Sequence, residues 1–160
     1  MPVDYIVASL KPLTFEGPAP YSWAEFLALL PEGFVVPDTV AGVGSPRWRD
    51  LETQLRNAMA SMRNGEKYRR PATGCDLYWQ GRVTAAFQES DPLKRATLLD
   101  RIWWDAAGEL TPVASPLSRG ALETYALRLK IMIGRDSISS ESGNAVFSRL
   151  TAEADEIRLA

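Results

Sequence analysis

The side chains that most often perform catalysis are scarce in this sequence. Histidine is absent, which excludes Ser-His-Asp and Cys-His catalytic arrangements and most zinc sites. The only cysteine, Cys75, has no second thiol and no base to activate it, so we interpret it as a small structural residue. Among the carboxylates, Asp105 and Glu109 would share one helix face with Asp100 nearby. That spacing is compatible with a divalent cation, but a solvated or helix-capping role is favoured, and we expect no catalytic residue, metal or cofactor.

A phosphate-binding loop is not expected either. Gly42-Val43-Gly44-Ser45 precedes a predicted helix, whose N-terminus would favour an anion. No lysine follows the serine, so the segment lacks the cation of a phosphate loop. We interpret it as a turn or hinge.

Arg128 is the charged residue with the least ordinary position. It falls among apolar residues on the most apolar helix that the sequence predicts. A buried arginine needs a carboxylate or carbonyl oxygens as partners. We expect an ion pair with Asp100 or Asp105 of the preceding helix; in the alternative, the side chain extends to water.

Two features suggest contacts with another protein. Adjacent residues on a helix point about 100° apart, so Trp103 and Trp104 can both be buried only if partners flank their helix on two sides. Trp104 is then either wedged beside a loop or exposed as a docking anchor. The second feature is a basic turn, which is either solvated or a contact for an acidic partner and comprises Arg63, Lys67, Arg69 and Arg70.

Length and charge limit the class of protein. The 160 residues suit a single domain. The 18 basic and 20 acidic residues give a net charge of −2, without the basic excess of a nucleic-acid binder or a polybasic membrane anchor. The N-terminus has no signal-peptide pattern, no stretch suits a membrane-spanning helix, and the single cysteine fits a reducing compartment. We therefore expect a cytoplasmic protein that acts on neither nucleic acid nor a small-molecule substrate.

Residues 117–134 are expected to be the centre of the fold. Ser115 and Pro116 can start a helix and Gly134 can end it. The segment is apolar around most of a helical wheel, which is typical of a helix enclosed by other helices. One apolar stripe contains Leu122, Tyr125, Leu129, Met132 and Ile133. The second stripe contains Leu127 and Ile131.

Further helices are expected around it. The capping box Ser22-Trp23-Ala24-Glu25 predicts a helix to Leu30, Ser45-Pro46 predicts one to Asn64, and others are expected at 76–89, 91–108 and 140–158. The residues expected to be buried are, in the order of these five helices, the following. They are Trp23, Phe26, Leu27 and Leu30 in the first; the heptad seam Trp48, Leu51, Leu55, Ala58 and Met62 in the second; Leu77, Val83, Ala86 and Phe87 in the third; Leu93, Ala96, Leu99, Ile102, Trp103 and Ala106 in the fourth; and Phe147, Leu150, Ala154 and Ile157 in the fifth.

These elements predict a single all-α domain of about six helices over residues 1–160. Residues 1–21 carry three prolines after position 10 and are expected to be an extended segment packed on the bundle. Within them, residues 5–10 fit a strand or a helical turn equally well. Phe34-Val35-Val36 leaves room for one small hairpin.

Three stretches of the chain together resemble a known family. They are Tyr5 to Pro12 followed by Ser22 to Leu27, then Ile102 to Asp105, and then Ala121 to Ile131 with Gly143 to Phe147. The chain resembles a bacterial family of unknown function encoded with the subunits of V/A-type rotary ATPases. That family is similar to the C subunit of these ATPases (called d in eukaryotes), the helical piece that couples the central stalk to the membrane rotor. The resemblance implies an all-helical, non-catalytic protein whose partners are ATPase subunits.

Three functional hypotheses follow. The first is a non-enzymatic subunit or assembly factor of a V/A-type ATPase, peripheral to the membrane through that complex. The second is a cytoplasmic adaptor that binds a partner helix in a groove beside the seam of residues 48–62. The third is a small ligand-binding protein or enzyme with a polar-lined pocket at Arg128, Asp100 and Asp105.

Overall fold

The chain folds as a bundle of helices. The computed structural model describes residues 1–38, 43–72, 74, 76–138 and 140–159. In this part of the chain there are seven α-helices and no strand, which confirms the all-α prediction and rules out a hairpin within it. The helices are α1 (Val3–Ser9), α2 (Trp23–Leu29), α3 (Pro46–Met62), α4 (Leu77–Phe87), α5 (Pro92–Gly108), α6 (Arg119–Asp136) and α7 (Ser140–Leu159), with one 3₁₀ turn, η1 (Glu66–Tyr68).

Side-chain caps explain where most helices begin. Ser22 and Glu25 form the predicted capping box at α2. Ser45 and Asp91 accept backbone N–H groups at the starts of α3 and α5, each with proline at the first helical position. The start of α6 differs from the prediction, because Ser118 rather than Ser115 provides the cap. Its end also differs, since the helix continues past Gly134 to Asp136.

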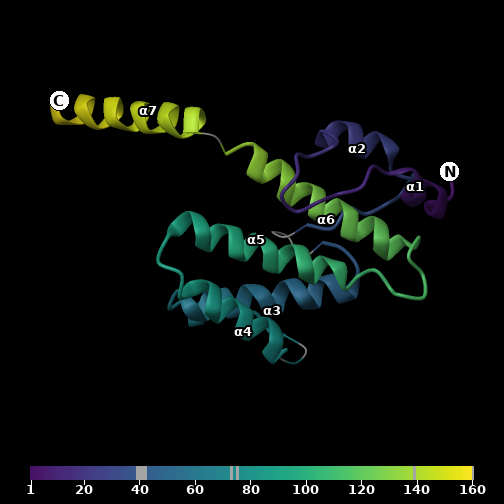
Figure 1. The fold of residues 1–160 in the computed structure, drawn as a ribbon. Coiled ribbons are helices and arrows are strands. Elements are labelled where there is room, and N and C mark those ends of the chain that lie inside the picture. Colours follow the sequence, from purple (N-terminus) through teal and green to yellow (C-terminus); the bar gives the residue numbers. More distant parts are fainter. Residues whose placement is uncertain (39–42, 73, 75, 139, 160) are drawn as a thin grey trace.

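The central position of α6 is confirmed. Leu122 and Leu129 face α1 and α2 and are fully buried, whereas Leu127 faces the core formed with α3, α4 and α5. Figure 1 shows α6 between the α1–α2 pair and α5, with α3 and α4 on the far side of α5. Removing α6 would therefore expose both halves of the core.

The N-terminal segment is less extended than expected. Residues 3–9 form α1, which settles residues 5–9 as helix, and Ile6 is buried against α6. Residues 11–21 form an irregular segment that crosses the bundle and places Phe15 against Trp104.

Some predicted inward residues point to solvent. Leu77 and Leu93 lie in the first turn of α4 and α5 and are 77% and 72% exposed, because the buried stripe of each helix starts later. In α4 it starts at Trp79, which was not among the predicted inward residues. Leu27, Met62 and Ala96 are also exposed, and Met59 takes the inward position at the end of α3.

The last helix is the largest departure. The prediction of a helix over 140–158 is confirmed by α7, but its burial is wrong. Phe147, Leu150 and Ile157 are 72%, 54% and 78% exposed, and Ala154 is exposed too. Figure 1 shows α7 (yellow) projecting from the end of α6, away from the other helices.

Candidate functional site

The apolar stripe of α7 is an uncovered surface in the described part of the chain. At about 100° per residue, its five apolar residues fall within roughly one third of the helix circumference. The pair formed by Arg149 and Glu153, at 3.9 Å, borders one side of this stripe, and Arg158 lies on the other side. Large apolar side chains grouped in this way commonly mark a protein contact. The residues of the stripe are Val146, Phe147, Leu150, Ala154 and Ile157.

The basic turn is exposed but partly neutralised. The Nη1 atom of Arg70 lies 3.3 Å from a carboxylate oxygen of Glu52, a fully buried residue that Arg56 also contacts. Arg69 pairs with Glu66 at 3.2 Å. Arg63 lies over the ring of Phe87, 5.4 Å from its centroid. Lys67 is exposed beside them, so contact with an acidic partner stays a prediction for this turn.

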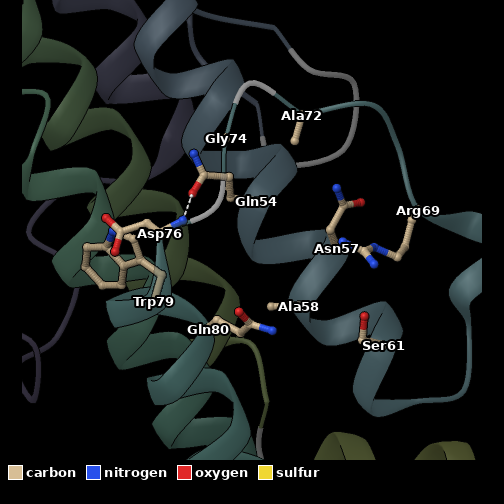
Figure 2. Close-up of a pocket in the computed structure, with 10 residues that line it drawn as sticks. All are labelled: Gln54, Asn57, Ala58, Ser61, Arg69, Ala72, Gly74, Asp76, Trp79 and Gln80. Atoms are coloured by element: carbon tan, nitrogen blue, oxygen red, sulfur yellow. Dashed lines mark hydrogen bonds between the residues drawn. The ribbon is translucent and has the colours of Figure 1, made fainter.

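A small pocket lies beneath the basic turn, between α3 and the start of α4 (Figure 2). The backbone N–H of Asp76 donates to Gln54 Oε1 at 2.9 Å across it. Trp79 Nε1 is buried there without an acceptor among the described residues. The cavity holds only about 50 Å³, enough for one or two water molecules. It is therefore too small for an organic substrate.

Trp104 is buried, so its predicted role as an exposed docking anchor is wrong. Only 6% of the residue is accessible. Its indole packs edge to face against Phe15, with ring centroids 5.5 Å apart, and both rings contact Met132. The other predicted alternative applies: Trp104 is wedged against the N-terminal loop. Trp103 is partly buried against the α3 side of the bundle.

Arg128 does not form the predicted ion pair. Its Nε donates to the carbonyl oxygen of Trp104 at 3.0 Å, and its guanidinium lies 4.9 Å from the centroid of the Trp104 ring. Within the described residues it has no carboxylate partner. Asp105 instead binds Arg82 at 2.7 Å and Arg101 at 3.4 Å. Arg82 comes from α4, whereas the prediction considered only α5 and α6 as the helices that form the ion pair. The pair between Arg82 and Asp105 was therefore not predicted.

The charges around Arg128 act on it from a distance. Burial lowers the pKa of Arg128; the negative charge of Asp105 opposes this shift and the positive charge of Arg101 adds to it. Asp100, on α5, lines a different pocket together with Arg135 of α6. Burial there raises the pKa of Asp100, and the charge of Arg135 opposes the shift. Asp100, Asp105 and Arg128 therefore do not converge on one site.

Arg128 does line an open pocket of about 290 Å³ between the end of α1 and α6. Its other polar residues, Lys11, Thr111, Thr124 and Tyr125, were not predicted as site residues. Neither was Gly108, where an added Cβ would lie 2.7 Å from Arg128 Nη2. The sequence marked Gly108 only as the end of a helix, and its closeness to the half-buried Arg128 depends on how α5 and α6 pack.

Within the described residues, most of the predicted seam of α3 is covered by other helices. Trp48 and Leu55 are fully buried and Leu51 is 7% exposed, because α4 and α5 cover them. Met62, at the end of the seam, is 39% exposed. The adaptor hypothesis, with a partner beside residues 48–62, stays a prediction for which the structure leaves little uncovered seam. The hypotheses for Cys75 and for Gly42 lie outside the described residues.

Metal sites and membrane spans are both absent from the described part of the chain. It contains no group of three or more His, Cys, Asp and Glu side chains placed to hold a metal ion. It also contains no helix with the length and apolar character that crossing a bilayer requires.

Comparison of the chain with protein-family models, curated proteins and solved structures finds no match. The resemblance to proteins encoded with V/A-type ATPases therefore stays a prediction from the sequence.

Proposed function

We propose that this protein is a non-catalytic subunit or assembly factor that holds a partner protein through α7. The observation that supports the proposal is the exposure of Phe147, Leu150 and Ile157 on one side of that helix. The core formed by the other helices is closed without them. Burying a side chain of this size contributes about 1.5–3 kcal/mol, so three of them can anchor a complex.

The partner we propose belongs to a V/A-type rotary ATPase, with this chain related to the central-stalk piece called C in bacteria and d in eukaryotes. The basis for this choice is the sequence resemblance. The protein would then be peripheral to the membrane through that complex. An amphipathic helix laid into an apolar groove of a helical partner is a common recognition mode, and it requires no catalytic group.

The geometry of α7 also predicts the rim of the partner's groove. The stripe is bordered by Arg149 and Glu153 on one side and Arg158 on the other. An apolar groove with an acidic group near Arg158 would complement it. Charges at the rim of an interface set orientation and association rate more than affinity.

Co-expression with the ATPase subunits tests the proposal. We expect the wild-type chain to co-purify stoichiometrically with one of them. A variant with Phe147→Ser, Leu150→Ser and Ile157→Ser should fold and lose that partner. The matched control is Leu77→Ser with Leu93→Ser, which removes equally exposed leucines outside α7 and should keep the partner.

Other outcomes would change the assignment. Equal recovery of the partner by the α7 variant would exclude the stripe as its binding surface. Self-association of the purified chain, abolished in the α7 variant, would assign the stripe to a homodimer. Failure of every ATPase subunit to co-purify would contradict the ATPase role while leaving other partners to be tested on α7.

A further inference from the structure

The pocket at Arg128 has apolar walls and a charged end. The end of α1 and the following segment contribute Leu10, Pro12 and Leu13, and Pro116 closes another side. Its volume of about 290 Å³ is close to the lower limit for sites that bind small molecules. None of its lining residues belongs to α7, so it is independent of the function proposed above.

Each of the three hydroxyl groups in the pocket already donates its proton to a hydrogen bond within the protein. Thr124 Oγ1 donates to the carbonyl oxygen of Ala107 at 2.7 Å. Because Thr124 has used its proton, the 2.9 Å contact between the two threonine hydroxyls requires Thr111 to be the donor. Tyr125 Oη donates to the carbonyl oxygen of Lys11 at 2.7 Å. None of the three hydroxyls has a proton left to give to a bound molecule.

The guanidinium of Arg128 is different. It uses Nε on the Trp104 carbonyl, and within the described residues neither terminal nitrogen has a hydrogen-bond or ion-pair partner. Asp105, the acid whose charge acts on Arg128, is already shared by Arg82 and Arg101. Removing part of a cation from water costs free energy, and a bound anion would offset that cost for Arg128.

We propose that this pocket binds a small carboxylate with a short apolar body, whose two oxygens pair with the terminal nitrogens of Arg128. The planar fork of an arginine matches a carboxylate in a bidentate arrangement. Contact with the Trp104 ring and with Gly108 holds the guanidinium in place. One fork and apolar walls suit a singly charged organic anion better than inorganic phosphate, which needs donors on several sides.

Lys11 adds positive charge at the rim. It lines the pocket, while its Nζ lies 4.8 Å from the centroid of the Tyr21 ring and 3.4 Å from the carbonyl oxygen of Pro20. These contacts are weak enough for the ammonium to shift toward a bound anion. Among the described residues, no carboxylate side chain lines the pocket to repel that anion.

Titration of the full chain with hexanoate at low ionic strength, followed by calorimetry and by amide NMR shifts, tests the assignment. We expect saturable binding of hexanoate and benzoate, with shifts at Thr111, Thr124 and Arg128. Hexanol, the neutral analogue, and inorganic phosphate should bind at least tenfold more weakly. Arg128→Leu should weaken hexanoate binding by roughly tenfold to a hundredfold, the value of a charge-assisted pair, whereas Arg128→Lys should retain part of it.

Two further variants keep the test decisive. Arg49→Leu, on the exposed surface of α3, removes the same charge elsewhere and should leave binding unchanged. Gly108→Ala keeps Arg128 but displaces its guanidinium, so it should weaken binding even if Arg128→Leu fails to fold. Hexanoate binding in the Gly108 and Arg128 variants within twofold of wild type would overturn the proposal. So would an absence of saturable binding, or phosphate binding tighter than hexanoate.

Discussion

Asn57 holds both backbone polar groups of Arg70. Its Nδ2 donates to the Arg70 carbonyl oxygen and its Oδ1 accepts from the Arg70 N–H, each at 2.8 Å. The fully buried Glu52, five residues before Asn57 on α3, contacts the Arg70 side chain. Three contacts therefore fix the loop after η1 on the surface of α3.

Replacing Asn57 with alanine should destabilise the protein by about 2–3 kcal/mol, because it removes two hydrogen bonds and leaves a donor and an acceptor unmatched. Urea unfolding followed by circular dichroism measures the change. Asn144→Ala, on the exposed surface of α7, should change the free energy of unfolding by less than about 0.5 kcal/mol. An equal effect of the two substitutions would contradict the role of Asn57.

Three glycine-to-alanine substitutions should have different effects. A Cβ at Gly120 would lie 2.0 Å from the backbone oxygen of Leu110, so Gly120→Ala should cost roughly 3 kcal/mol or prevent folding. At Gly81 nothing lies within 4 Å, and alanine should stabilise α4 by about 0.5–1 kcal/mol. Gly108→Ala should leave the free energy of unfolding nearly unchanged, because the end of the Arg128 side chain can move away from the added methyl group. Thermal unfolding of the three variants tests this order.

Trp104→Ala should lower the free energy of unfolding by about 3–5 kcal/mol, as expected for truncating a buried aromatic residue. The substitution removes the packing with Phe15 and Met132 and the ring beneath Arg128. Tyr5→Ala, at a residue 62% exposed, is the control and should cost far less. Chemical denaturation of both variants separates a structural Trp104 from an exposed one.

Asp100→Asn should stabilise the protein at pH 7, by no more than about 1 kcal/mol because part of the side chain stays in water. Burial raises the pKa of Asp100 in the folded state above its usual 3.8, so the folded chain carries an unfavourable charge at neutral pH. The advantage of the variant should begin to shrink as the pH falls through that raised pKa, because the folded carboxylate is then protonated first, and should disappear once the pH is below the unfolded value near 3.8. Asp105→Asn is the contrast, because it loses the pairs with Arg82 and Arg101 and should be destabilising. Lower stability of the Asp100→Asn variant than of wild type at pH 7 would refute the prediction.

A chain that ends at Ile138 should unfold with a free energy within about 0.5 kcal/mol of the full chain, because the stripe of α7 covers no core residue. Differential scanning calorimetry of the two chains measures this. A loss of several kcal/mol would mean that α7 packs on the bundle in solution.

The helices were predictable because their starts are local. Ser22, Ser45 and Asp91 cap the chain segments beside them, and a cap needs no information from distant residues. The predicted start of α6 was wrong because Ser115 before Pro116 has the pattern of a cap, whereas Ser118, three residues later, provides the cap in the structure. Apolar periodicity then identified α6 as the central helix.

The candidate site was less predictable, since it depends on tertiary contacts. The sequence singled out Arg128, but Arg82, which lies 23 residues before Asp105, takes the carboxylate that Arg128 was expected to bind. The stripe of α7 was also visible in the sequence. Periodicity identifies such a stripe without stating whether the same chain or another molecule covers it.

The length of α7 has a mechanical consequence. A helix of 20 residues extends about 30 Å, comparable to the width of a small domain. A partner bound near Ile157 would thus lie well clear of the bundle, and α6 and α7 are separated by a segment that includes Ser137 and Ile138, which are not helical. That short connection, more than the stiffness of α7 itself, would then govern how closely the partner follows a movement of the bundle.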